Sequence, residues 1–284
     1  MSDALDLIER HLPDCSKGQR KISRYLMEHY ASAVGMTAAK LAQAVGTSES
    51  TVVRFAAELG YPGYPELQAA LKESVRDSLT SVQRVELSQN EDGKNAFARS
   101  MRTDIENIKR TLADTDIRVL DRVADKLMTA RRIYILGTRS ASSLAIFLNY
   151  YLEQLFDDVR LVQTTSGNEI LDQMFSVGEQ DVVVGISFPR YSRRTVDALD
   201  FSRKRGAFVC AVTDSEHSPL TDLADESILA HNENGSFADS LVAPMAVLNA
   251  LIASVVGKKP EEFAHRLSLL EEVWSEYNVY SRNR

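Results

Sequence analysis

The segment DVVVGISFPRYSRRT, residues 181–195, decides the fold of the second half of the chain. It begins with an apolar run, which is typical of a strand buried on both faces, and it leads into the helical pattern TVDALDFSRKRG. Strands of this kind belong to parallel sheets that are covered by helices. The loop between strand and helix holds two serines and three arginines, so this junction is suited to binding an anion.

The same alternation of strand and helix extends on both sides of this segment. Further strands are predicted at 131–137, 158–164, 207–214 and 224–230, and helices at 142–155 and 243–257. This pattern predicts a doubly wound parallel sheet, in which ligands bind beyond the carboxyl ends of the strands. The loops at those ends are GTRSAS (137–142), ISFPRYS (186–192) and VTDSEHSP (212–219).

The first part of the chain has a different pattern, with helices throughout. Apolar residues recur at helical spacing in residues 19–30, 37–45 and 50–60, and the turn-rich YPGYP at 61–65 precedes another helical segment. Polarity rises around SQNEDGKN (88–95), which indicates a boundary. Two longer helices are predicted at 95–112 and 116–130, before the first strand.

A helix-turn-helix arrangement is predicted within this helical part. Thr37 is suited to cap one helix and Ser48 to cap the next, because a hydroxyl can accept a hydrogen bond from the exposed N–H groups of a first turn. Gly46 lies between them, where the chain must turn sharply. Val52, Phe55 and Leu59 are expected to face inward. This arrangement matches the unit whose second helix enters the major groove of DNA, while an ordinary capped helical hairpin stays open as the alternative.

The distribution of charge neither requires nor excludes DNA binding. The 284-residue chain has a formal net charge of −7, and residues 1–80 are nearly neutral, with nine Lys and Arg against ten Asp and Glu. DNA binding would therefore depend on local placement of positive charge. One basic cluster falls along a predicted helix and is either a DNA-facing surface or a solvated helix face: Lys17, Arg20, Lys21 and Arg24.

The motifs together resemble a known family. Residues 48–71, SESTVVRFAAELGYPGYPELQAAL, resemble the helix-turn-helix of the RpiR family of bacterial transcription regulators, and LGTRSASSLA, ISFPRYSRRT and VTDSEHSPLTDLAD resemble its sugar isomerase (SIS) domain. The resemblance implies an α plus α/β chain, with an all-helical DNA-binding domain followed by a doubly wound SIS domain. The expected boundaries are a helix-turn-helix domain at 1–80, a helical linker at 81–114, the SIS domain at 115–258 and a helical tail at 259–284.

The resemblance implies that the second helix of the helix-turn-helix reads DNA. Small hydroxyls and an arginine at the start of that helix are suited to phosphates and base edges. The predicted DNA-binding residues are Thr37, Lys40, Ser48, Glu49, Ser50, Thr51 and Arg54.

SIS domains of this family bind phosphorylated sugars with two loops, G-x-G-x-S and S-x-S-G-x-T, and this chain departs from both. Arg139 replaces the second glycine of the first loop, and Ala141 falls on its serine position. In the second loop Pro189 and Arg190 replace the second serine and the glycine. The proline removes two donors, while the arginines add planar donor forks suited to phosphate or carboxylate. The predicted effector-binding residues are Gly137, Arg139, Ser140, Ser142, Ser187, Arg190 and Ser192.

We therefore expect a cytoplasmic transcriptional regulator that senses an anionic sugar-type metabolite, a sugar phosphate or sugar acid. It would bind a palindromic double-stranded DNA operator as a homodimer or homotetramer, without a membrane segment, cofactor, metal site or catalytic residue. His217 is the one candidate general base by residue type, and Cys15 and Cys210 are expected to be reduced thiols. A sugar-phosphate isomerase and an assembly module without ligand remain as alternatives. Arginines paired with Asp197 or Glu169 would be the alternative to an effector site.

Overall fold

The chain divides into two compact units, Met1–Ala96 and Phe97–Arg284, and each is described by itself. A computed structural model describes residues 4–75, 82, 84–85, 95–163, 168–233 and 237–280. Helix α8 (Ala96–Asp114) falls in the region predicted as a linker, and nearly all of it belongs to the second unit. The predicted all-helical first part and the predicted parallel α/β second part are both confirmed.

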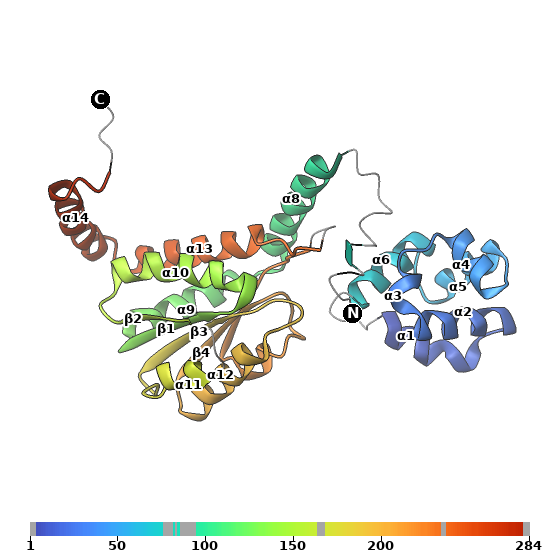
Figure 1. The fold of residues 1–284 in the computed structure, drawn as a ribbon, viewed down its shortest axis with the longest axis horizontal. Helices are drawn as coiled ribbons and strands as arrows, with labels where there is room; N and C mark the ends of the chain where they lie inside the picture. The colour runs from blue at the N-terminus through green and yellow to red at the C-terminus, as the bar shows by residue number, and fades with distance from the viewer. Residues whose placement is uncertain are drawn as a thin grey trace. The chain divides into compact units, whose positions relative to one another are not determined.

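The first unit is built from short amphipathic helices around one apolar core (Figure 1). Ile22, Leu41, Val52, Phe55 and Leu67 are completely buried in this core, at the spacing that helix packing requires. The helices are α1 (Ala4–His11), α2 (Lys17–Glu28), α3 (Tyr30–Ala33), α4 (Ala38–Val45), α5 (Glu49–Glu58) and α6 (Tyr64–Val75).

The predicted caps of the helix-turn-helix are confirmed. The Thr37 side chain accepts a hydrogen bond from the Lys40 N–H at 3.3 Å, and Ser48 accepts one from the Thr51 N–H at 3.2 Å. Gly46 ends α4 in the left-handed region with φ of 66°, a conformation that side chains with a Cβ rarely adopt. Because each signal is local, α4, the turn and α5 form as the sequence predicts.

The second unit contains a five-stranded parallel sheet with the order β2-β1-β3-β4-β5. The strands are β1 (Arg132–Gly137), β2 (Val159–Val162), β3 (Asp181–Ile186), β4 (Phe208–Thr213) and β5 (Glu226–Leu229). From β1 the chain passes to β2 on one side and then returns to β3 on the other. The order of the strands therefore reverses between β1 and β3, and a crevice opens at such a switch point.

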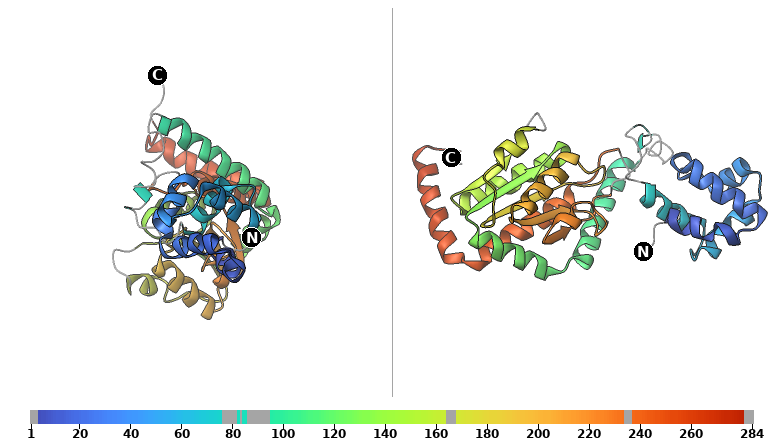
Figure 2. Two further views of the ribbon diagram at one scale, coloured as in Figure 1. Left: turned by 90° about the vertical axis from the view of Figure 1, so that its right-hand side faces the viewer. Right: turned by 90° about the horizontal axis from the view of Figure 1, so that it is seen from below.

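Helices cover both faces of this sheet (Figures 1 and 2). One apolar core lies between the sheet and α9 (Ile117–Thr129), α10 (Ser142–Leu155) and α13 (Val242–Lys258). A second core lies between the opposite face and α11 (Asn168–Gln173) and α12 (Arg193–Lys204). The helix α14 (Pro260–Glu276) follows α13 and packs against α10.

Helix α11 was absent from the sequence-based expectations. It has only six residues, NEILDQ, too few to show a helical repeat of apolar side chains. Among the described residues no single helix is long and apolar enough to cross a membrane; α13 and α14 meet that criterion only together, as a pair bent by 106°.

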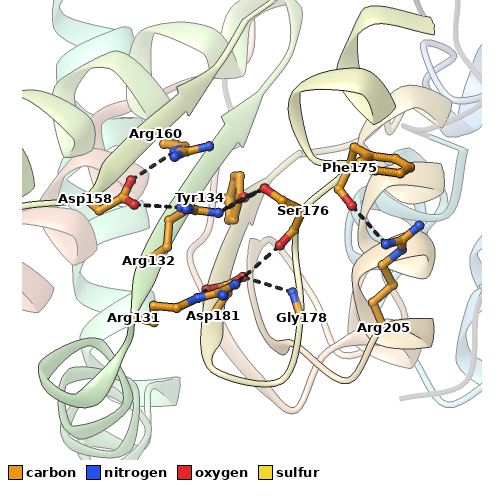
Figure 3. A network of polar contacts seen from close by, with 10 residues as sticks. All are labelled: Arg131, Arg132, Tyr134, Asp158, Arg160, Phe175, Ser176, Gly178, Asp181 and Arg205. Atoms are coloured by element: carbon orange, nitrogen blue, oxygen red, sulfur yellow. Dashed lines mark hydrogen bonds and ion pairs between the residues drawn. The ribbon is translucent and has the colours of Figure 1, made fainter.

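A network of ion pairs joins the amino ends of β1 and β3, opposite to the crevice (Figure 3). The buried carboxylate of Asp181 accepts two hydrogen bonds from Arg131, at 2.9 and 2.7 Å, and a third from the Gly178 N–H at 2.9 Å. Arg132 donates to Asp158 at 2.7 Å, and the Arg132 and Arg160 guanidinium groups hold the pKa of Asp158 below its usual value. These arginines therefore stabilise the fold at the amino ends of the strands, away from the carboxyl ends where ligands bind in this class of sheet.

Candidate DNA-reading helix and effector site

The predicted DNA-binding residues lie together at the solvent side of the helix-turn-helix. Ser48, Glu49, Ser50 and Arg54 are exposed at the start of α5, and Thr51 is half-buried beside them. Thr37 and Lys40 are exposed at the start of α4. On the inner side of α5, Val52, Phe55 and Leu59 are buried, as predicted. The amino end of α5 is therefore available to a DNA duplex.

The hydroxyl groups at this end of α5 form one cluster. The Ser48 Oγ lies 2.9 Å from the Ser50 Oγ and 2.8 Å from the Thr51 Oγ1. Because each hydroxyl carries one donor and two acceptor lone pairs, the cluster can cap the helix and still contact a phosphate or a base edge.

Helix α2 places positive charge beside the same turn. A Cβ atom added to Gly46 would lie 3.9 Å from the Lys21 Nζ, and one added to Gly18 would lie 3.3 Å from the Thr51 Cγ2. The predicted basic cluster is exposed along this helix, although Arg20 also donates to the Cys15 carbonyl at 3.2 Å. Lys21 was named in the basic cluster as a possible DNA-facing residue, but its proximity to the turn could not be predicted because it depends on how α2 packs.

The second candidate site is a cavity of about 970 Å³ at the carboxyl ends of β1 and β3. It lies where the strand order reverses, which is the expected place for a ligand in an open parallel sheet. Its lining comes from the two predicted loops, the end of β2, the start of α11 and the first turn of α12: Gly137, Thr138, Arg139, Ser142, Val162, Gln163, Glu169, Arg190, Tyr191, Ser192, Arg193 and Arg194.

A smaller cavity of about 270 Å³ adjoins the same two loops and holds the remaining predicted residues, Ser140 and Ser187. Arg139, Arg190 and Ser192 line both cavities. The fold thus brings all seven predicted effector residues to one end of the sheet, divided between two adjoining hollows.

Arg139 and Arg190 both have left-handed backbone conformations, with φ of 57° and 60°. This conformation costs a residue with a Cβ atom about 1–2 kcal/mol. These are the two positions at which the loop patterns of the family have glycine. The arginines have therefore replaced the glycines while the backbone keeps the conformation that glycine favours.

Several hydroxyls of the site already have partners within the protein. Ser142 donates to the Arg139 carbonyl at 2.6 Å, which stabilises the tight turn after β1. Ser187 is buried and accepts a hydrogen bond from the Ser192 N–H at 3.1 Å. Gly137 must lack a side chain, because an added Cβ atom would lie 2.5 Å from the Ala141 carbonyl oxygen. These contacts shape the two loops.

The larger cavity is lined by more positive than negative charge. Arg139, Arg190, Arg193 and Arg194 line it, whereas Glu169 is the one carboxylate among its described lining residues. Arg193 forms an ion pair with Asp197 at 3.7 Å, so the predicted alternative of local pairing with this acid holds for Arg193.

Some residues of the cavity were missing from the sequence-based site. They are Thr138, Val162, Gln163, Glu169, Tyr191, Arg193 and Arg194. Arg193 and Arg194 could have been predicted from the sequence, since they begin the helix that follows the second loop. Tyr191 had no such signal: its hydroxyl donates to Asp214 at 2.8 Å and so joins the second loop to the third.

Other candidate groups lie away from both sites. His217 is exposed in the turn after β4 and lines neither cavity. Cys15 and Cys210 are free and buried, one in each unit, and burial raises the pKa of the Cys210 thiol to about 12. Within the described ranges no group of His, Cys, Asp and Glu side chains is arranged to hold a metal ion.

Comparisons with known proteins agree with this two-part architecture. Residues 2–78 match the helix-turn-helix domain of the rpiR family, and residues 126–254 match the SIS domain. The chain is 27% identical to the HTH-type transcriptional regulator HexR of Pseudomonas aeruginosa over 279 residues, which cover 96% of this chain and 95% of that protein.

Solved structures show the same fold. The sugar isomerase domain of an RpiR transcription factor from Sphaerobacter thermophilus is 26% identical and superimposes with a TM-score of 0.59, over 62% of this chain and 97% of the other. The Vibrio vulnificus NanR protein, solved in complex with ManNAc-6P, is 21% identical with a TM-score of 0.60, over 99% of this chain and all of the other. With a capped helix-turn-helix followed by a SIS domain, the chain belongs to the RpiR family of DNA-binding transcriptional regulators.

Proposed function

We propose that the SIS domain of this regulator senses an anionic sugar-type metabolite, a sugar phosphate or sugar acid, and thereby changes its affinity for operator DNA. The observation that carries the proposal is the gathering of four arginines around one cavity at the switch point of the sheet. Two of them, Arg139 and Arg190, hold left-handed backbone conformations. Strained residues of this kind cluster at functional sites.

The helix α12 supports an anionic ligand independently. It begins with Arg193 and Arg194 and has no acidic residue in its first turn. Positive side chains at a helix amino end oppose the helix dipole, and a bound anion would interact favourably with both the dipole and the arginines. The first-turn N–H groups of α12 and the guanidinium groups would share the anion.

The rest of the ligand is expected to be polar. Thr138, Gln163 and Ser192 line the same cavity and offer hydrogen bonds of the kind that sugar hydroxyls need. The complex of the similar NanR protein with ManNAc-6P provides a precedent for a phosphorylated sugar in this fold. Because two arginines replace glycines in this chain, we include sugar acids beside sugar phosphates.

On the DNA side, we propose that α5 enters the major groove and that its exposed amino end reads bases. Phosphates would be contacted by the hydroxyl groups of Ser48, Ser50 and Thr51. Arg54 would contact either a phosphate or the edge of a guanine base. The border of the contact would be formed by Glu49, Thr37 and Lys40. One short helix reads few base pairs, so two copies on a palindromic operator would supply the required specificity.

The test is thermal unfolding of the full chain with a panel of hexose phosphates, N-acetylhexosamine phosphates, sugar acids and inorganic phosphate. We expect at least one sugar-type anion to raise the midpoint and to change operator binding in a gel shift, and Arg190→Ala to abolish both effects. If no member of the panel shifts the midpoint, and the Arg190→Ala variant responds in cells like the natural chain, the proposal is wrong.

A sugar-phosphate isomerase remains the second candidate, because Glu169 is a carboxylate in the larger cavity that could serve as a base. We propose sensing without turnover, since the similar HexR protein is a transcriptional regulator. An aldose–ketose isomerisation assay separates the two functions. Turnover that disappears in Glu169→Gln would replace the sensing proposal with catalysis.

A further inference from the structure

Helix α8 carries an apolar stripe that is exposed to solvent. Five side chains along one side of the helix are 39–80% exposed: Phe97, Met101, Ile105, Ile108 and Leu112. They follow one another at intervals of four, four, three and four residues, which keeps them on one side of a helix. A contiguous apolar surface of this kind marks an interaction site.

The side of α8 that faces its own unit is polar instead. Asn107 is buried and donates to the Glu233 carbonyl at 2.6 Å, and the buried Thr111 accepts from the His231 N–H at 2.9 Å. Asp104 accepts a hydrogen bond from Ser240 at 2.5 Å. A helix that only covered its own domain would bury its apolar side. The arrangement of α8 therefore leaves the stripe available to a partner.

The spacing of the stripe indicates what kind of partner fits. The stripe follows a seven-residue repeat. Its first position is occupied by Ala98, Ile105 and Leu112, and its fourth position by Met101 and Ile108. This repeat is the seam along which two α-helices pair in a coiled coil. The partner with the matching repeat is the α8 helix of a second copy.

The charges beside the seam favour parallel pairing. Arg102 and Lys109 flank the seam on one side, where Lys109 also pairs with Glu106 at 3.8 Å. Asp104, which also accepts the hydrogen bond from Ser240, flanks it at the border with its own unit. In a parallel pair, residues at the positions of Asp104 and Lys109 face each other across the seam, which brings opposite charges together. An antiparallel pair would bring Arg102 close to Lys109 of the second copy and place like charges together.

We infer that two copies of this chain associate through a parallel α8–α8 seam. Both helices then begin at the same end, which is the end that each chain reaches from its helix-turn-helix unit. Such pairing would suit a palindromic operator, but the inference depends neither on DNA nor on the effector.

Disulfide trapping in the full chain tests the inference. The natural cysteines are buried, and Ile105→Cys would place one thiol at the centre of the seam, next to that of the second copy. Glu106→Cys, exposed on the neighbouring position outside the stripe, is the matched control. Under mild oxidation we expect a reducible covalent dimer for Ile105→Cys and none for Glu106→Cys.

Sedimentation of the unoxidised chain provides a second measurement. Ile105→Glu, checked for folding by circular dichroism, should raise the dimer dissociation constant roughly 100-fold or more, because a charge would be buried in the seam. A monomeric natural chain, or equal cross-linking by both cysteine variants, would overturn the inference. Ile146 is an exposed apolar side chain on α10. An oligomer that resists Ile105→Glu and dissociates with Ile146→Glu would place the contact on α10 instead and also overturn the inference.

Discussion

Replacing the left-handed arginines with glycine should make the SIS domain more stable and less responsive. Arg139 and Arg190 have φ of 57° and 60°, and the left-handed conformation costs about 1–2 kcal/mol at each position. Glycine removes that cost, but its greater conformational freedom in the unfolded chain lowers the folding stability by roughly 0.5–1 kcal/mol. The net gain is about 0.5–1 kcal/mol per site, or about 1–2 kcal/mol for the pair.

The matched control is the pair of alanine variants, which lose the same charges but keep a Cβ atom at positive φ. The difference between glycine and alanine therefore isolates the backbone. For a unit of this size, a gain of about 1–2 kcal/mol corresponds to about 2–8 °C in the unfolding midpoint. The chain has one tryptophan, Trp274 in α14, so its fluorescence reports on the second unit during urea or thermal unfolding.

Double glycine is expected to be more stable than double alanine. Neither variant is expected to respond to the sugar-type anion that we propose as the ligand. A double-glycine variant no more stable than double alanine would refute the strain argument. A double-alanine variant that still responded fully to the anion would show that the two guanidinium groups do not bind it.

Four further outcomes follow from the described contacts. Arg54→Ala should weaken operator binding by roughly 10–100-fold in a gel shift and leave the sedimentation coefficient unchanged; dissociation of the oligomer would instead make Arg54 structural. Ser48→Ala should destabilise the first unit by about 1 kcal/mol in urea, because the cap on the Thr51 N–H is lost, and Ser48→Asp should restore it. Lys21→Ala should reduce the slope of log affinity against log salt by about 1, whereas an unchanged slope would exclude Lys21 from the phosphate contacts. Asp158→Asn should make the loss of folding stability in acid less steep. Because the pKa of Asp158 is lowered in the folded state, the carboxylate stabilises the fold above its unfolded pKa of 3.8, and this contribution is lost as the pH falls below that value. Acid unfolding as steep as that of the natural chain would contradict the ion pair with Arg132.

The features that the sequence predicted well are those determined locally. The caps at Thr37 and Ser48 and the turn at Gly46 depend on neighbours within four residues, and the structure has all three. The strands of the sheet were also predictable, because an apolar run such as DVVVG at 181–185 is stable only where both faces are buried.

The features that the sequence missed depend on packing between distant segments. The sequence placed Lys21 in a basic cluster but not beside the helix-turn-helix turn, which it reaches only because α2 packs there. Tyr191 meets Asp214 only because β3 and β4 are neighbours. No pattern of residue types in the sequence predicts these contacts.

The polar side chains at the two ends of the sheet have separate tasks. Arg131 and Arg132 hold β1, β3 and their neighbours together through Asp181 and Asp158 at the amino ends, while Arg139 and Arg190 line the cavities at the carboxyl ends. Substitutions in the cavity therefore leave those ion pairs intact. New ligand preferences, whether engineered or evolved, could therefore change the cavity loops without breaking the ion pairs that join the amino ends of the strands.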